Sequence, residues 1–414
     1  MAGTFALTNC GQVATCSEAG VIEDATVLVS DGVIVAVSEG QQVPPDVETI
    51  DVGGRVVTPG LIDAHTHAVF AGSRVDEYEM RAKGASYQEI ASAGGGIKAT
   101  MRAVRKATES ELFDQSKKHA DWMFRSGTTT AEMKSGYGLT LEDELKMLRV
   151  IKRLDEETPI DTQATFLGAH AVPPEFDDRA AYMDYLCDAM MPAVMEQGIA
   201  VAVDMFVEDG YFSHEDAERL ANCSAGLQTC IGDERGSRGR SPSLRLRLHV
   251  DQFSTGGAVL AARLNASTAD HLEQTTDTGI EALKESGTIP VLLPGSVYAL
   301  GLGKYPDARK MIDEGLPVVL ATDFNPGSSP TPSLPMIMSL ACTQMGMTPA
   351  EALLACTKNA ATALGYKDRG QIKQGTVADL VAWDVDDYRE IPYFFGVDHV
   401  HTIYKNGERA IFRA

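Results

Sequence analysis

The sequence carries little positive charge. Its 36 lysines and arginines face 58 aspartates and glutamates, which gives a formal net charge of −22. Nucleic acids and anionic membrane surfaces are bound through basic patches, so this balance argues against both as partners. It also means that an anionic substrate would need cations placed locally to hold it.

The sequence also lacks a cysteine framework, a leader-like start and long apolar runs. Its seven cysteines are an odd number and form no C-x-x-C motif, which is typical of reduced thiols. Residues Met1–Phe5 show no basic segment followed by an apolar one, and no apolar run approaches the ~20 residues that span a bilayer. We therefore expect a soluble, cytoplasmic protein.

Both ends of the chain are rich in β-forming residues and turns. Ala25–Val37 holds two β-rich runs joined by Asp31-Gly32, which is a strong hairpin signal. The same texture returns at Gly375–Asp384 and Val400–Gly407. At 414 residues the chain exceeds what one hydrophobic core usually supports. We expect a small β domain built from both termini beside a larger unit.

The middle of the chain alternates short apolar runs with helical stretches, such as Glu109–Ser126, Leu141–Leu154 and Ala350–Leu364. Eight of these runs end in polar or glycine residues: Asp63–His67, Thr130–Lys134, Phe166–His170, Val203–Glu208, Leu246–Asp251, Ser267–His271, Pro290–Pro294 and Val318–Asp323. Eight strands, each followed by a turn or helix, predict an α/β fold, a (β/α)8 TIM barrel. In such barrels the chemistry lies at the C-terminal ends of the strands.

The first of these strands ends in His65-Thr-His67. Side chains at positions i and i+2 of a strand point to the same face, so both imidazoles can reach one metal ion. The spacing alone is a weak signal, since His399-Val-His401 has it too. For that second pair, an ordinary solvated or hydrogen-bonded state is the better interpretation.

Ligands converging from other strands distinguish the first pair. Five of the nine histidines end predicted barrel strands: His65, His67, His170, His249 and His271. Asp323 ends the eighth strand, whereas His119 and His214 fall in helical sequence and are expected at the surface. Such convergence on one rim favours metal chemistry, and imidazoles with a carboxylate suit Zn²⁺ or Fe²⁺. The fourth strand offers no terminal lysine to bridge a second ion, so we expect one ion.

Such an ion would lower the pKa of a bound water and polarise the bond under attack. Asp323 could bind the ion or receive the proton of the water, and His271 could stabilise the developing oxyanion. Arg74 is suited to bidentate recognition of a carboxylate. Two glycine-containing turns, Lys134–Gly138 and Asn325–Ser329, could bring backbone N–H groups close to a ligand.

One stretch does not fit the alternating pattern. Asn222–Arg247 combines glycine, serine and arginine with little periodicity. We expect it to form an extended loop before the fifth strand.

Several motifs, in order along the chain, resemble the metal-dependent amidohydrolase superfamily. The general ones are Pro59–His67, His249, His271, Thr322-Asp323 and Gly375–Val381. More specific ones resemble the superfamily's hydrolases of histidine degradation: His67–Arg74, Lys134–Leu139, Phe166–Pro174, His249–Gln252 and Asp323–Ser328. The resemblance covers nearly the whole chain. It implies hydrolysis of the cyclic amide of 4-imidazolone-5-propanoate, a small anionic substrate, to N-formimino-L-glutamate.

The resemblance also implies roles for individual residues. The ligands of one Zn²⁺ or iron (Fe²⁺ or Fe³⁺) ion would be His65, His67, His249 and Asp323. The substrate contacts would be Arg74, Tyr87, Tyr137, His170, Gln252, Asn325, Gly327 and Ser328. His271 would be the catalytic histidine and would share proton transfer with Asp323. Some relatives have glutamate at position 252; the glutamine found here can hydrogen-bond the ring but cannot act as a base.

The domain organisation follows from the same resemblance. An accessory β-sandwich would comprise residues 1–57 and 366–414, and the barrel would comprise residues 58–365. Relatives are often homodimers, so a homodimer is a further expectation.

Two other functions stay open at this point. The chain could be a deaminase or another cyclic-amide hydrolase, whose substrates usually lack a flexible carboxylate and so would not depend on Arg74. It could also be a catalytically silent scaffold, although such a protein would be expected to have lost ligands that are all present here.

Overall fold

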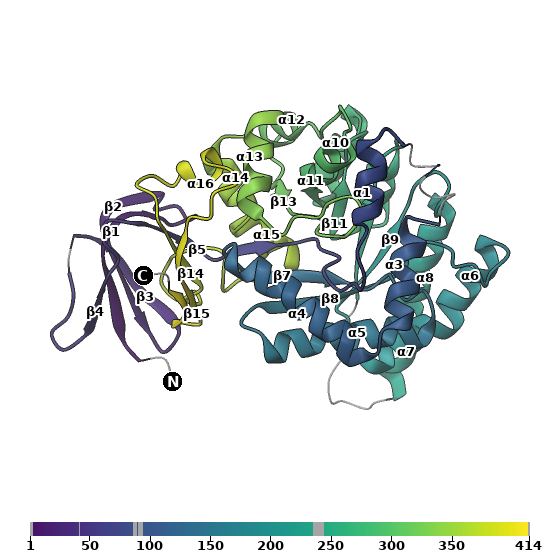
Figure 1. Cartoon of the computed structure of the whole chain (residues 1–414), viewed down its shortest axis with the longest axis horizontal. Helices are drawn as coiled ribbons and strands as arrows, with labels where there is room; N and C mark the ends of the chain where they lie inside the picture. Colours follow the sequence, from purple (N-terminus) through teal and green to yellow (C-terminus); the bar gives the residue numbers. More distant parts are fainter. Residues whose placement is uncertain (1–2, 41, 86–88, 90–93, 235–243, 413–414) are drawn as a thin grey trace.

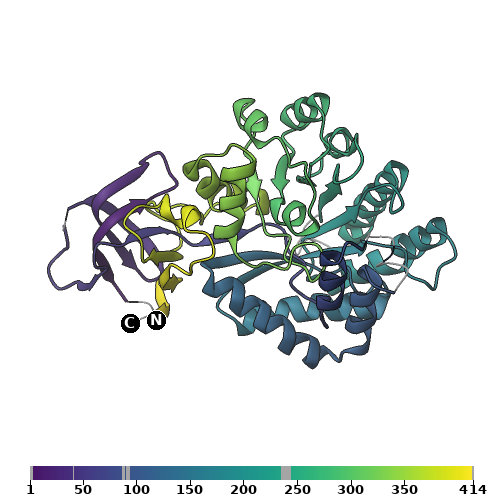
Figure 2. The same ribbon diagram turned by 45° about the horizontal axis from the view of Figure 1, so that its top comes forward.

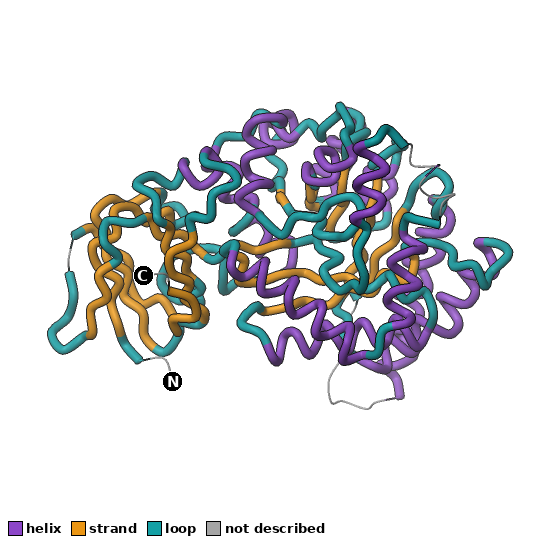
Figure 3. The backbone as a smooth tube through the Cα atoms, in the orientation of Figure 1, coloured by secondary structure: helices purple, strands orange, loops and turns teal. Residues whose placement is uncertain are grey.

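The computed structural model describes residues 3–412 except 41, 86–88, 90–93 and 235–243. Two eight-stranded sheets organise the chain. One is curved into a barrel with helices around it, and the other lies at its side (Figure 1, Figure 2). Strands and loops make up nearly all of the smaller part, whereas helices surround the barrel (Figure 3).

The barrel contains the predicted eight strands. They are β6 (Leu61–Asp63), β7 (Thr128–Lys134), β8 (Asp161–Ala169), β9 (Ala202–Phe206), β10 (Arg245–Val250), β11 (Thr268–His271), β12 (Ile289–Leu292) and β13 (Val319–Leu320). Each pairs in parallel with its sequence neighbour. Beyond the ends of β6 and β13 the chain closes the ring, since Asp323 N–H donates to His65 O at 3.0 Å and His67 N–H donates to Phe324 O at 3.0 Å. The predicted α/β barrel is confirmed.

Helices follow most of these strands. They are α1 (Val75–Ala82), α3 (Ile97–Lys106), α4 (Glu109–Arg125), α5 (Leu141–Glu157), α6 (Arg179–Tyr185), the π-helical turn η1 (Leu186–Met190), α7 (Met191–Gln197), α8 (His214–Glu234), α9 (Gly257–Arg263), α10 (Asp277–Ser286), α11 (Pro294–Leu300), α12 (Ala308–Asp313), α13 (Leu334–Gln344), α14 (Pro349–Ala355), α15 (Lys358–Leu364) and α16 (Glu390–Tyr393). Threonine side chains fix two starts: Thr108 forms a capping box with Glu111 at α4, and Thr140 accepts from Asp143 N–H at α5. No helix among the described residues is long and apolar enough to cross a membrane.

Both termini build the second sheet. Its strands are β1 (Phe5–Ala14), β2 (Val21–Ser30), β3 (Val33–Glu39), β4 (Glu48–Asp51), β5 (Val56–Pro59), β14 (Leu380–Trp383), β15 (Val400–Lys405) and β16 (Glu408–Phe412). The order is β16-β15-β14-β5-β1-β2-β3, with β4 on β1. Asp31 and Gly32, with φ of 50° and 79°, form the predicted turn between β2 and β3. The proposed boundary between residues 57 and 58 stays a prediction, because β5 continues through Gly60 into the barrel.

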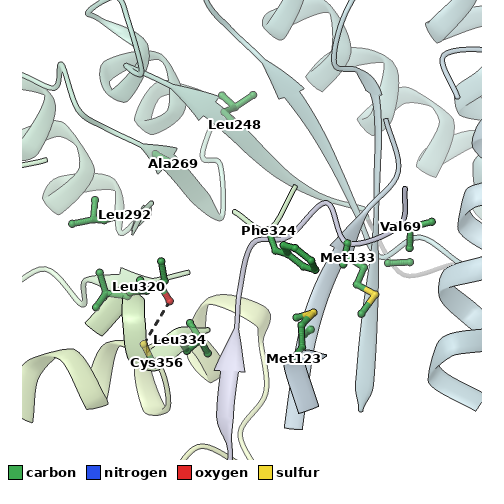
Figure 4. Close-up of a cluster of buried hydrophobic side chains, with 14 of the residues drawn as sticks. Val69, Met123, Met133, Leu248, Ala269, Leu292, Leu320, Phe324, Leu334 and Cys356 are labelled. Carbon is green, nitrogen blue, oxygen red and sulfur yellow. Dashed lines mark hydrogen bonds between the residues drawn. The ribbon is translucent and has the colours of Figure 1, made fainter. Parts of the chain in front are cut away.

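The main apolar core fills the barrel and its helical shell. Figure 4 shows part of it, with Met133, Leu248 and Leu320 contributed by different barrel strands. Phe324, which follows the eighth strand, packs into the same cluster. This packing holds the strand ends, and therefore the polar residues that follow them, in fixed positions.

Two predictions about helical sequence need correction. The predicted helix Ala350–Leu364 is two helices, α14 and α15, since the Cys356 carbonyl accepts the Ile62 N–H of the barrel at 2.8 Å instead of continuing the helix. The predicted loop Asn222–Arg247 is wrong in its first half, because α8 runs to Glu234. Single glycines inside a helix cost only ~1 kcal/mol each, which the surrounding helix-forming residues outweigh. Residues 235–243 lie outside the described part of the chain.

The prediction for His119 was also wrong. The side chain is only 8% exposed, its Nδ1 lies 2.8 Å from the Ala68 carbonyl oxygen, and its ring stacks on Phe70 at 4.1 Å. It shares the core-facing stripe of α4 with buried Met123, so helical periodicity places it toward the barrel. His214, by contrast, is exposed as expected.

Candidate metal centre and substrate pocket

The five strand-end histidines meet at one rim of the barrel, as predicted. All five are buried. The ring centroids of His65 and His249 lie 4.4 Å apart, and those of His67 and His170 lie 5.1 Å apart. His271 joins the group from β11, 5.5 Å from His249.

Three of these histidines have the arrangement of metal ligands. His65, His67 and His249 each place one ring nitrogen within 4.8 Å of the others, and they form the one such group of three or more His, Cys, Asp or Glu found among the described residues. Asp323 Oδ1 lies 3.6 Å from His65 Nε2 and 3.4 Å from His67 Nε2. Burial lowers the pKa of His65 and of His67, which favours neutral imidazoles with a free lone pair.

The contacts inside this group fit a cation better than a hydrogen-bonded cluster. His67 Nε2 and His249 Nε2 lie 3.3 Å apart. If His67 carries its proton on Nε2 it can donate to His249, but its buried Nδ1 is then left without a hydrogen-bond partner among the described residues. His65 Nε2 is buried and has no hydrogen-bond partner among the described residues. Three imidazoles with a carboxylate are ligands that Zn²⁺ and Fe²⁺ accept.

Buried carboxylates orient two of the imidazoles from behind. His65 Nδ1 lies 2.6 Å from Asp270 Oδ2, and His249 Nδ1 lies 3.1 Å from Asp204 Oδ1. These contacts place the protons on Nδ1 and direct the Nε2 atoms of both rings toward the group's centre. Sequence analysis missed both carboxylates. The available signal was an acidic residue inside each of two buried parallel strands, β9 and β11.

Lys134 connects these carboxylates to one another. Its Nζ lies 2.8 Å from Asp204 Oδ2, 2.8 Å from Glu132 Oε1 and 3.8 Å from Asp270 Oδ2. Although burial alone would lower it, the carboxylates raise the pKa of Lys134, so the ammonium is charged. Burial raises the pKa of Asp270 to about 6, whereas the fields of His249 and Lys134 overcome burial and lower the pKa of Asp204.

His271 carries a different electrostatic environment from the three ligand histidines. Its Nδ1 faces Glu273 Oε1 at 3.3 Å. Burial alone would lower the pKa of His271, but the Glu273 carboxylate raises it to about 9. His271 and Leu272 also have φ of 83° and 70°, and Asp323 has φ of 52°. Such backbone conformations of non-glycine residues concentrate at functional sites.

Tyr137 and His170 form one wall beside the metal group. Tyr137 is 2% exposed, and its ring lies 5.2 Å from that of His170 and 5.9 Å from that of His67. Burial raises the pKa of Tyr137, which keeps the phenol protonated. The loop that carries it is held by Glu144, another buried carboxylate that the sequence analysis missed. Glu144 accepts hydrogen bonds from three backbone N–H groups of residues 136–139.

Arg74 lies against the turn that follows the eighth strand. Its Nε and Nη2 donate to Glu77 Oε2 at 2.9 and 2.7 Å. The guanidinium packs so closely on Gly327 that a Cβ there would lie 2.0 Å from Nη1. The absence of a side chain at Gly327 therefore makes room for Arg74.

The side chain of Asn325 builds this turn. Its Oδ1 accepts from Gly327 N–H at 2.8 Å and from Ser328 N–H at 2.7 Å, and its Nδ2 donates to Asp323 O at 2.6 Å. The structure thus gives Asn325 the task of holding the residues around it.

Of the remaining predicted substrate residues, the structure describes Gln252 but not Tyr87. Gln252 follows β10 and is buried, and its backbone N–H donates to Glu208 Oε1 at 2.6 Å. The Glu208 carboxylate also accepts from the backbone of Phe253 and Ser254, so it fixes this loop. Tyr87 lies outside the described residues.

Comparison with known proteins identifies relatives over nearly the whole chain. Residues 252–410 match the model of the amidohydrolase family. The imidazolonepropionase of Solibacter usitatus is 46% identical over 422 residues, covering 97% of each chain. That of Geobacillus kaustophilus is 46% identical over 402 residues, covering 95% of this chain and 91% of the relative.

Solved structures resemble the chain in fold. A triazine hydrolase variant superposes with a TM-score of 0.75 at 17% identity, covering 99% of this chain and 95% of the other. An adenosine deaminase from Xanthomonas campestris gives a TM-score of 0.70 at 19% identity, covering 99% and 93%.

Proposed function

The chain belongs to the imidazolonepropionase family of amidohydrolases, and we propose that it holds one metal ion between His65, His67, His249 and Asp323. As a member of that family it hydrolyses the ring amide C–N bond of 4-imidazolone-5-propanoate and yields N-formimino-L-glutamate, a step of histidine degradation. The observation that carries the proposed site is the buried group of ring nitrogens within 4.8 Å of one another.

The residues fit a zinc or iron ion. When bound, such an ion activates water and polarises the ring carbonyl. The chain supplies neutral histidines whose Nδ1 protons are held by Asp204 and Asp270, so that the opposite nitrogens are free to bind.

Proton transfer falls to Asp323 and His271. We assign the Asp323 carboxylate to accept the proton of the attacking water and to deliver it to the ring nitrogen that leaves. His271 Nδ1 is engaged by Glu273, which leaves Nε2 to donate toward the carbonyl oxygen as negative charge develops there. The raised pKa of His271 supports this assignment, because a protonated ring can donate from Nε2.

We assign substrate recognition to Arg74 and to the turn after the eighth strand. The propanoate is anionic in a protein of net charge −22, so a local cation must hold it. Arg74 is that cation in our proposal, with Gly327, Ser328 and the turn built by Asn325 beside it. Tyr137, His170 and Gln252 would surround the ring, and Tyr87 is a further proposed contact.

The direct test is an assay that follows the loss of imidazolonepropionate absorbance, with metal content measured on the same sample. We expect turnover by the metal-loaded protein, loss after chelation, and recovery on adding back Zn²⁺ or Fe²⁺. Absence of turnover by metal-loaded protein would overturn the proposed function. Elemental analysis of protein purified without added metal would identify the native ion.

Two finer expectations remain proposals. We infer a cytoplasmic homodimer, on the resemblance to the family. Tyr393, Phe395 and Val397 are 72%, 61% and 57% exposed, and this apolar patch is one face that a second subunit could cover. Light scattering on the purified protein distinguishes a monomer from a dimer.

A further inference from the structure

Two cysteines away from the metal group lie in contact with each other. Cys187 belongs to η1, and Cys223 belongs to α8, 36 residues later in the chain. The Cys223 Sγ lies 3.5 Å from the Cys187 carbonyl oxygen, and the two thiol groups hydrogen-bond to each other. This contact joins two neighbouring segments of the helical shell, on either side of strand β9 in the sequence.

The surroundings make one of the two thiols reactive. The hydrogen bond from Cys223 lowers the pKa of the Cys187 thiol against the opposing effect of burial, and the nearby Arg219 guanidinium lowers it further. Arg219 stands one helical turn before Cys223 on α8 and is itself anchored by Asp184. A cysteine beside both a guanidinium and a second thiol is placed to act as a nucleophile.

The other described cysteines differ from Cys187, and Cys223 itself keeps a raised pKa because of its contact with Cys187 and its burial. Burial raises the pKa of Cys10 and Cys16 to about 12 and that of Cys342 to about 11. Cys356 is fully buried, and its pKa is raised as well. Access also favours the pair, since Cys223 is partly exposed and Cys187, at 8% exposure, is within reach of a small oxidant.

The backbone at Cys187 departs from a regular α-helix. Residues Leu186–Met190 form a π-helical turn between α6 and α7. Such turns interrupt helices and are frequent at functional positions. A disulfide needs the two sulfur atoms to approach to ~2.05 Å, so the side chains at this contact must move closer together.

We propose that Cys187 and Cys223 form a reversible disulfide when the protein meets hydrogen peroxide. The Cys187 sulfur attacks one peroxide oxygen, the O–O bond breaks, and the thiol proton leaves in a first water as Cys187 becomes a sulfenic acid. The Cys223 sulfur then attacks the Cys187 sulfur, the S–O bond breaks, and the Cys223 proton leaves in a second water. Two thiols are oxidised and one peroxide is reduced to two waters.

The test uses the full-length metal-loaded protein, treated with a small excess of hydrogen peroxide, alkylated, and digested without reductant. We expect a peptide that links Cys187 to Cys223, loss of two of the seven thiols, and recovery of both with dithiothreitol. A link to any other cysteine, oxidation that dithiothreitol cannot reverse, or no loss of thiols would overturn the proposal.

Matched variants make the test specific. In Cys223→Ser, the link should disappear and the sulfenic acid of Cys187 should accumulate, where dimedone can trap it. Cys342→Ser removes a cysteine of similar, partial exposure and should keep the link. Should Cys223→Ser fold poorly, Cys223→Ala also removes the second thiol and should abolish the link. Trapping at Cys223 rather than at Cys187 in the unchanged protein would also contradict the proposed order.

Discussion

The two ends of the barrel both bury charged groups but treat them differently. At the N-terminal ends of the strands, Asp161 accepts hydrogen bonds from Arg369 and, at 2.8 Å, from Lys405 Nζ. Lys405 also donates to Asp379 Oδ2 at 2.6 Å, and Arg369 donates to Thr130 Oγ1 at 3.1 Å. Partners of opposite sign meet, and the cluster ties the barrel to the sheet formed by the termini.

At the C-terminal ends the charges converge without satisfying one another. Asp204 and Asp270 pair with Lys134, yet His65 Nε2 and His67 Nδ1 are buried without a hydrogen-bond partner among the described residues. The contrast teaches how to separate stability from function in a barrel. Charges that pair completely hold the fold together, whereas buried ring nitrogens without a hydrogen-bond partner remain free to bind a metal ion.

The largest expected effect comes from removing a ligand of this group. His67→Ala should lower kcat/KM on the order of 1000-fold, since the ion's contribution is worth several kcal/mol. Metal content per subunit should fall with it. The matched control is His401→Ala, which removes a histidine of the other H-x-H pair and should change neither quantity. Equal losses in both variants would remove the distinction between the two pairs.

The second prediction compares a buried lysine from each end. Lys134→Met leaves Asp204 and Glu132 without their cation and should lower the free energy of unfolding by about 3–5 kcal/mol. It should also weaken metal binding about 10- to 100-fold, measured by competition with a chromophoric chelator, because the imidazoles lose their support. Lys405→Met should destabilise the fold and leave metal affinity unchanged. A change in metal affinity in Lys405→Met would erase the proposed difference between the ends.

The third prediction concerns substrate binding on the C-terminal side. Arg74→Ala should raise KM about 10- to 100-fold, much more than it lowers kcat, because it removes a charge-assisted contact to the propanoate. Gly327→Ala should act in the same direction, since its Cβ would lie 2.0 Å from Arg74 Nη1. Gly303→Ala is the control, because open space surrounds that position. Unchanged KM in Arg74→Ala would remove this residue from the binding role.

The sequence allowed the barrel and the histidine cluster to be predicted because both rest on local periodicity. Eight apolar runs predicted eight strands. Side chains just after the strands of a parallel barrel lie at one rim, regardless of how long the connecting loops are. His65, His249 and Asp323 were found in this way. The break between α14 and α15 could not be predicted, because it depends on a carbonyl diverted to Ile62, almost 300 positions away.

The supporting carboxylates were missed for the same physical reason. Asp204 and Asp270 act through contacts with His249 and His65, which lie 45 and 205 residues away in the sequence. The sign that was overlooked is their position, since an ionisable residue inside a barrel strand that is buried on both faces must find a buried partner. His119 was misplaced because its polarity was weighed above its helical register.

The smallest expected effect lies in the ion cluster at the N-terminal end. Although burial alone would raise it, Lys405 and Arg369 hold the pKa of Asp161 below its usual value. A carboxylate with a lowered folded-state pKa stabilises the fold above its unfolded pKa of about 4, and this contribution is lost as the pH falls through the folded value. Asp161→Asn should therefore lower the free energy of unfolding at pH 7 by about 1 kcal/mol, after allowance for partial exposure of the side chain.

The difference between Asp161→Asn and the unchanged protein should shrink as the pH falls below 4 and the Asp161 carboxylate becomes protonated, and urea titrations at pH 7 and pH 3 measure it. The control is Asp121→Asn. The Asp121 side chain is 50% exposed and pairs with Arg125 at the surface, so this variant should change the free energy of unfolding by less than about 0.5 kcal/mol. Neither variant should alter kcat or KM at pH 7, because both lie away from the metal group. A rise in KM in Asp161→Asn alone would show that the two ends of the barrel are coupled, and the separation of stability from function would then fail.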